Sequence, residues 1–76
     1  MYNLSLLEVR DGIDRLTKYL AATPSAQGYL QLGQLLQEDA RIDDAVVAYE
    51  HALKLNPTFT EAKIALTKLQ QTANGQ

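Results

Sequence analysis

Apolar residues recur at intervals of three and four along almost the whole chain, which is the spacing of one face of an α-helix. Signals for β-strands are missing, because the body of the sequence has no run that alternates apolar and polar residues and no Asn-Gly hairpin turn. We therefore expect an all-α fold. With 76 residues, the chain is expected to form a single domain over 1–76.

Four helical segments are expected from these intervals and from the residues that interrupt them. Pro24 disfavours a helical conformation in the residue before it, and Asn56-Pro57 stops a later helix. The segments are expected at 5–22, 26–38, 42–55 and 58–72. Because all the connections are short, neighbouring helices must run roughly antiparallel, as helical hairpins.

Capping residues precede three of these segments. Ser5 and Glu8 have the spacing of a capping box, and Thr58 and Glu61 repeat this spacing before the last segment. Ser25 is a suitable N-cap for the second segment. We expect these hydroxyl groups to accept hydrogen bonds from the first amides of each helix, which have no partner inside the helix.

The first segment carries a narrow apolar seam whose members follow one another at steps of four and three residues, as in a coiled coil. Its members are Tyr2, Leu6, Val9, Ile13, Leu16 and Leu20. Two roles are open for the seam, namely packing inside the chain or pairing with another copy. On the opposite face, Asp11 and Arg15 are one turn apart and are expected to form an ion pair.

Large and small side chains alternate on the second and third segments. The residues concerned are Tyr29, Leu32, Gly33 and Leu36, then Ala45, Tyr49 and Ala52, and finally Pro57. This spacing resembles the tetratricopeptide repeat, whose signature has an aromatic, Leu-Gly and an aromatic on helix A, then Ala, an aromatic and Ala on helix B, and a closing proline. Ala40 stands in the turn where this family often has Gly. The resemblance covers about 26–59.

This resemblance implies a fragment of a tetratricopeptide-like α-solenoid made of four helices. Helices A and B of one repeat would be 26–38 and 42–55, with a capping helix at 58–72. The N-terminal helix would take the place of a preceding helix B. Gly33 and Ala45 are small because helices A and B must approach closely, and the third segment is expected to bury Ile42, Ala45, Val46, Tyr49, Ala52 and Leu53.

Members of this family bind partners along the concave surface formed by successive A helices. The partner-binding residues implied here are Gln27, Leu30, Gln31, Gln34, Gln37, Ile64 and Lys68. The amides can bond to the backbone of an extended or helical peptide, while Leu30 and Ile64 give apolar contact. Glutamines are also good helix formers on solvated faces. The carboxylate clamp of some chaperone-binding relatives is not supported, because Leu30 and Gln34 stand at its positions.

We therefore expect a protein–protein interaction module that binds another protein or a peptide, of unknown identity, through the concave helix-A surface. The alternative is a homo-oligomerisation or scaffold element that self-associates through the N-terminal helix as a homodimer. Mass in solution distinguishes the two interpretations.

No pattern in the sequence points to an enzyme, a cofactor or a metal. His51 is the single histidine and there is no cysteine, so no metal-ligand set can be completed. Asp43 and Asp44 are adjacent on a helix and point in different directions. The basic residues are scattered and the formal net charge is −2, which argues against nucleic-acid binding.

No apolar run is long enough to cross a membrane. The first residues lack the basic and apolar parts of a signal peptide. The default expectation is a cytoplasmic location.

Overall fold

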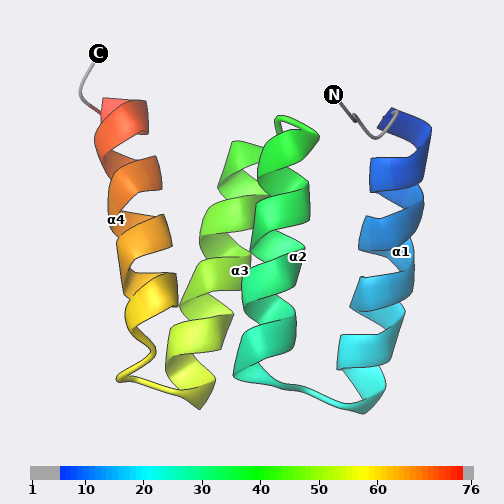
Figure 1. Ribbon diagram of the computed structural model, residues 1–76, viewed down its shortest axis with the longest axis horizontal. Coiled ribbons are helices and arrows are strands. Elements are labelled where there is room, and N and C mark those ends of the chain that lie inside the picture. Colours follow the sequence, from blue (N-terminus) through cyan, green and yellow to red (C-terminus); the bar gives the residue numbers. More distant parts are fainter. Residues whose placement is uncertain (1–5, 75–76) are drawn as a thin grey trace.

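The computed structural model describes residues 6–74, and in this range it contains four α-helices and no strand. The helices are α1 Leu6–Ala22, α2 Ala26–Glu38, α3 Ile42–Leu55 and α4 Thr60–Asn74. The all-α class expected from the sequence is confirmed. Each helix runs antiparallel to the one before it, and α2 and α3 lie between the outer helices α1 and α4 (Figure 1).

The start of α2 has the expected cap. The side-chain oxygen of Ser25 accepts a hydrogen bond from the backbone amide of Gly28 at 3.0 Å. This contact satisfies one of the amides that the first turn leaves without a partner inside the helix. The cap expected at Ser5 lies outside the described residues.

The start of α4 differs from the expectation, which placed it at residue 58. The amide and the hydroxyl of Thr58 both donate to the side-chain oxygen of Asn56, at 3.3 and 3.1 Å. This turn holds Thr58 outside the helix, so the helix begins at Thr60 and extends to Asn74. The first helical hydrogen bond runs from the amide of Lys63 to the carbonyl of Phe59, at 3.1 Å. The capping box expected at Thr58 is therefore wrong.

The turn from α2 to α3 contains a residue with a left-handed backbone. Ala40 has a φ of 61°, and its amide donates to the carbonyl of Gln37 at 2.9 Å. The next amide, of Arg41, donates to the carbonyl of Leu36 at 2.8 Å. These two bonds form a Schellman motif, which usually has glycine in the left-handed position. Ala40 thus adopts a backbone conformation that is usual for glycine.

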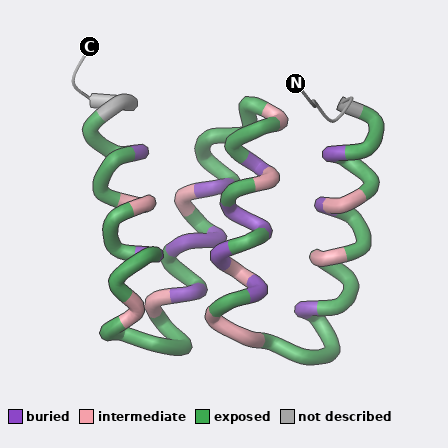
Figure 2. Tube along the Cα trace, viewed as in Figure 1, coloured by how far each residue is buried: buried purple, intermediate pink, exposed green. Residues whose placement is uncertain are grey.

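The buried apolar residues form one core cluster, and Figure 2 marks the positions of the buried residues on all four helices. The seam residues Val9, Ile13 and Leu20 are buried in it, and Leu16 is partly buried against it. The other buried members are Leu30, Leu32, Leu36, Ala45, Ala48, Tyr49, Ala52, Ala62 and Leu69. The seam of α1 therefore packs inside the chain, while Tyr2 and the side chain of Leu6 lie outside the described parts.

Ile42 differs from the expectation that the core would bury it. It is 36% exposed, because it is the first residue of α3 and lies at the edge of the core. Ala45 and Val46, one turn further along the same helix, are buried and half-buried respectively.

The helices α2 and α3 approach each other closely at Gly33. A Cβ atom added to Gly33 would lie 2.5 Å from Cε1 of Tyr49 and 2.7 Å from its Cδ1. The ring of Tyr49 therefore lies directly against the backbone of α2, and Tyr49 is almost completely buried. Any side chain larger than that of glycine would have to displace this ring.

An ion pair joins α1 to the end of α2. Nε of Arg10 donates to both carboxylate oxygens of Asp39, at 3.2 and 3.4 Å. The side chain of Asp39 is only 3% exposed, whereas that of Arg10 is 63% exposed. Nη1 of Arg41 lies 3.8 Å from the same carboxylate. The charge of Asp39 is therefore almost covered and depends on these two cations.

Candidate functional site

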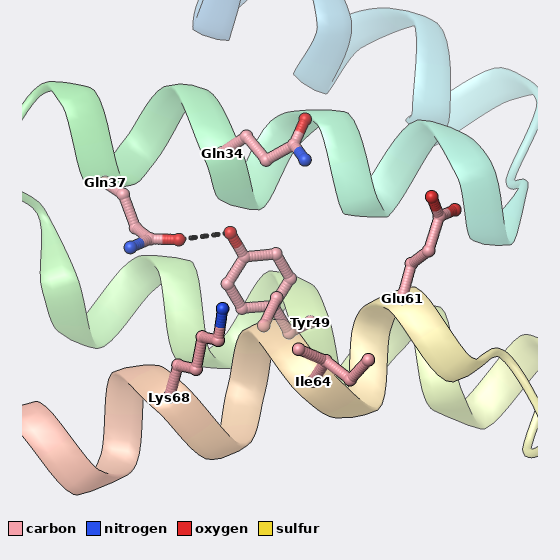
Figure 3. A pocket seen from close by; sticks show the side chains of 7 residues that line it. Gln34, Gln37, Tyr49, Glu61, Ile64 and Lys68 are labelled. Carbon is pink, nitrogen blue, oxygen red and sulfur yellow. Dashed lines mark hydrogen bonds between the residues drawn. The ribbon is translucent and has the colours of Figure 1, made fainter.

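A hollow of about 350 Å³ lies between α2 and α4, with Tyr49 of α3 between them (Figure 3). The helices α2 and α4 both run antiparallel to α3, so they are parallel to each other. The lining residues are Gln34 and Gln37 of α2, Tyr49 of α3, and Glu61, Ile64, Ala65 and Lys68 of α4.

Four of the seven residues expected to bind a partner line this hollow. They are Gln34, Gln37, Ile64 and Lys68. Two others, Gln27 and Gln31, are exposed on α2 but do not line it.

Leu30 differs from this expectation. It is 4% exposed and belongs to the core, so its assignment as an apolar contact for a partner is wrong. The physical reason is its position on the helix, because Leu30 stands three residues before Gly33 and so shares the face that packs on α3.

Three residues of the hollow were missed from the sequence. Tyr49 was assigned to the core alone, although a buried tyrosine hydroxyl needs a hydrogen-bond partner and often reaches a polar edge. Glu61 and Ala65 share a face of α4 with Ile64 and Lys68, at spacings of three, four and seven residues. That stripe was visible in the sequence once Ile64 and Lys68 had been chosen.

The floor of the hollow is fixed by one hydrogen bond. The hydroxyl of Tyr49 donates to Oε1 of Gln37, as Figure 3 shows. Burial raises the pKa of Tyr49 above its usual value of 10.0, so the hydroxyl remains a protonated donor at neutral pH. This bond holds the amide of Gln37 against the ring, with its own NH₂ group as a further donor.

The wall formed by α4 combines an apolar side chain with two charges. Ile64 is 50% exposed, which leaves half of a large apolar side chain open to solvent beside Ala65. Glu61 lies in the first turn of α4 and Lys68 two turns further along. Their side chains both reach from α4 toward α2 (Figure 3). The hollow therefore offers amides on one wall and an apolar patch between opposite charges on the other.

Two further hollows are each lined by a single helix. One, of about 320 Å³, is lined by Val47, Glu50, His51 and Lys54 of α3. The other, of about 310 Å³, is lined by Lys63, Ile64, Thr67 and Lys68 of α4. Neither brings side chains of different helices together, so neither has the convergent polar groups of a binding site.

His51 takes part in packing. Its ring stacks on that of Tyr29, with 5.0 Å between the centroids and 20° between the planes. This stacked pair is a contact between α2 and α3.

Within residues 6–74, no group of three or more His, Asp or Glu side chains is placed to hold a metal ion. No helix in that part of the chain is both long enough and apolar enough to cross a membrane.

No protein-family model, curated protein or solved structure matches this chain. The possible ligands of the hollow are therefore inferred from the side chains that line it.

Proposed function

We propose that this chain is a protein–protein interaction module of the tetratricopeptide type, which binds a segment of a partner protein in the hollow between α2 and α4. The observation that carries the proposal is the convergence of Gln34 and Gln37 from one helix with half-exposed Ile64 from another. Amide groups can bond to a polypeptide backbone, and an open apolar side chain can contact an apolar residue of the partner.

The fixed floor of the hollow favours binding. The hydrogen bond between Tyr49 and Gln37 restricts the amide before any partner arrives. A side chain that is already ordered loses less conformational entropy when it binds. Gln34, on the same helix, is exposed and adaptable. The two amides thus combine one fixed contact with one adjustable contact.

Two features of the α2–α3 hairpin support the repeat type. Gly33 gives room for the ring of Tyr49, which is the role of the small and aromatic positions in the family pattern. Ala40 takes the left-handed conformation at the position where that pattern often has glycine.

The outer face of α4 agrees with a terminal helix. Lys63 and Thr67 are exposed and stand where a further repeat would have its aromatic residue and glycine. Terminal repeats need a polar outer face for solubility.

Self-association through α1 is not proposed. The apolar seam is already covered in the core. The exposed side of α1 carries ion pairs between Asp11 and Arg15 at 3.0 Å, as expected from the sequence, and between Asp14 and Lys18 at 3.3 Å. This face also exposes Leu7 and Tyr19, at 79% and 58%, but the seam that would pair two copies is buried in the core.

The proposal is tested by affinity capture from an extract of the source organism with Ile64→Asp as the variant and Val47→Asp as the matched control. Ile64 and Val47 are 50% and 49% exposed, so both changes replace equally exposed apolar side chains by a carboxylate, but Val47 lies on α3 outside the hollow. We expect wild type and Val47→Asp to retain the same partner and Ile64→Asp to lose it.

The captured partner is then titrated into ¹⁵N-labelled chain and the amide shifts are mapped. Shifts are expected at Gln34, Gln37 and Ala65. Shifts confined to α1, or equal capture by both aspartate variants, would contradict the proposed site.

A further inference from the structure

The two charges of the hollow stand at opposite ends of one wall. Glu61 and Lys68 are seven residues apart on α4, which separates their backbones by about 10 Å at 1.5 Å per residue. Ile64 and Ala65 lie between them on the same wall. The order along α4 is therefore acidic, apolar and basic.

The charge of Glu61 is available to a ligand. Within residues 6–74, Glu61 takes part in no ion pair. Its position in the first turn of α4 suits the positive end of the helix, but that preference does not decide where the side chain points. Figure 3 shows the carboxylate directed across the hollow toward α2. The ammonium of Lys68 has three donors and can serve more than one acceptor.

An extended segment fits this hollow better than a helix. A helix is about 10–12 Å wide with its side chains and has satisfied its own backbone, so the amides of Gln34 and Gln37 would find no main-chain partner. A polyproline-type segment has no internal hydrogen bonds. In such a segment, two residues that are three positions apart lie about 9 Å apart along the axis, and their side chains point to the same face. That distance matches the separation of Glu61 and Lys68.

We propose that the hollow selects an extended peptide segment that carries a basic side chain for Glu61 and an acidic side chain for Lys68, three residues apart, so that both charges lie on the face that meets α4. This inference rests on the proposed function and adds the chemistry of the partner to it. The opposite charges also fix which end of the segment lies at Glu61.

The test is panning of a random seven-residue peptide display library against the wild-type chain and the charge variants Glu61→Lys and Lys68→Glu. We expect wild type to enrich peptides with one basic and one acidic residue three positions apart. Glu61→Lys is expected to enrich peptides with two acidic residues, and Lys68→Glu peptides with two basic residues.

The matched controls are Glu50→Lys and Lys54→Glu, which make the same charge changes on the exposed face of α3. Both are expected to enrich the wild-type pattern. Each charge variant of the hollow should weaken a wild-type-selected peptide by about two- to fivefold at low salt, and less at high salt, as for solvent-exposed ion pairs. Glu61→Gln removes the charge with little change of shape and should abolish the preference for a basic residue, which keeps the test valid if Glu61→Lys does not fold.

Two results would overturn the inference, and they can be told apart. In the first result, the enriched peptides lack the charge pattern, bind Val47→Asp as well as wild type, and do not bind Ile64→Asp. This result would contradict the proposed charge pattern and leave the proposed function standing. An absence of enriched peptides, or peptides that bind Ile64→Asp as well as wild type, would contradict both.

Discussion

Gly33 and Tyr49 connect the core of this protein to its candidate site. The ring of Tyr49 packs against the backbone of α2 where Gly33 leaves room, and its hydroxyl reaches the hollow and bonds to Gln37. A change at Gly33 would therefore move the ring and, with it, the amide that lines the hollow. The fit between two helices and the geometry of the candidate site depend on the same side chain.

We expect Gly33→Ala to destabilise the fold although alanine is the better helix former. A Cβ atom at Gly33 would lie 2.5 Å from the buried ring of Tyr49, and overpacking of this kind costs about 1–3 kcal/mol. The gain in helix propensity is about 1 kcal/mol, so the net loss should be up to about 2 kcal/mol. The measurement is the free energy of unfolding from urea denaturation.

Gly12→Ala is the matched control for this prediction. A Cβ atom at Gly12 would meet only Cδ1 of Leu35, at 3.4 Å, which is an ordinary contact. Helix propensity should then dominate and stabilise the fold by up to about 1 kcal/mol. Equal effects of the two substitutions would show that contact with Tyr49 does not require the glycine.

The residues that the sequence predicted well are those whose role depends on two helices only. Gly33 needs to be small because of α3, and the spacing of the hairpin shows this directly. Leu30 was misjudged, whereas Tyr49 was correctly expected in the core and only the contact of its hydroxyl with Gln37 was missed. Periodicity marks Leu30 as apolar but does not say whether other helices cover it.

At the scale of the elements, the turn between α2 and α3 has a strained backbone conformation at Ala40. A non-glycine residue in the left-handed region costs about 1–2 kcal/mol, and Ala40 has a φ of 61°. Ala40→Gly should relieve this cost, partly offset by the larger entropy of glycine in the unfolded chain. We expect a net stabilisation of about 0.5–1 kcal/mol in urea denaturation.

The control for this substitution is Ala21→Gly, at an exposed position inside α1. Glycine there lowers helix propensity with no left-handed strain to relieve, so it should destabilise the fold by up to about 1 kcal/mol. If both glycine substitutions destabilised, the left-handed conformation of Ala40 would not be a source of strain.

The attachment of α1 to α2 depends on the covered carboxylate of Asp39. Arg10→Ala removes the closest cation and leaves Arg41 at 3.8 Å as the remaining partner. An almost buried charge that loses a hydrogen-bonded partner costs about 1–3 kcal/mol, and we expect a loss of that size in the free energy of unfolding. Arg15→Ala, whose pair with Asp11 is exposed on both sides, should cost less than about 1 kcal/mol. A smaller loss for Arg10→Ala than for Arg15→Ala would contradict this role of Asp39.

The sequence placed α2 and α3 at the ranges that the structure has, but it placed the start of α4 two residues early. The reason is local competition for one donor. The Thr58 and Glu61 spacing predicts a cap, yet Asn56 precedes it and accepts from the amide of Thr58 first. A capping pattern indicates that a helix begins nearby. The residue at which the helix begins depends on which side chain accepts a hydrogen bond from the first free backbone amide.

At the scale of the whole molecule, the helices contact mainly their neighbours in sequence. The interface between α2 and α3 is the largest, while α1 contacts chiefly α2 and α4 chiefly α3. One wall of the candidate site is therefore an outer helix, held on one side only. Binding of a partner across α2 and α4 would add a second contact to α4.

This arrangement predicts a gradient of protection in native-state hydrogen exchange. Amides in the middle of α2 and α3 should exchange only by global unfolding, because both helices are covered on two sides. Amides of α1 and α4 should open at a free energy lower by at least about 1.4 kcal/mol, which is a tenfold faster exchange. The measurement is exchange followed by NMR over a series of low denaturant concentrations, which separates local opening from global unfolding.

Two perturbations make the gradient specific to each outer helix. Arg10→Ala should lower the protection of α1 and leave that of α4 unchanged, because Asp39 holds only α1. A bound partner should raise the protection of α4 more than that of α1, since the hollow lies between α2 and α4. Equal protection of all four helices would show that the chain unfolds as one cooperative unit. In that case α4 would be as rigid as the core, and partner binding could not act by ordering it.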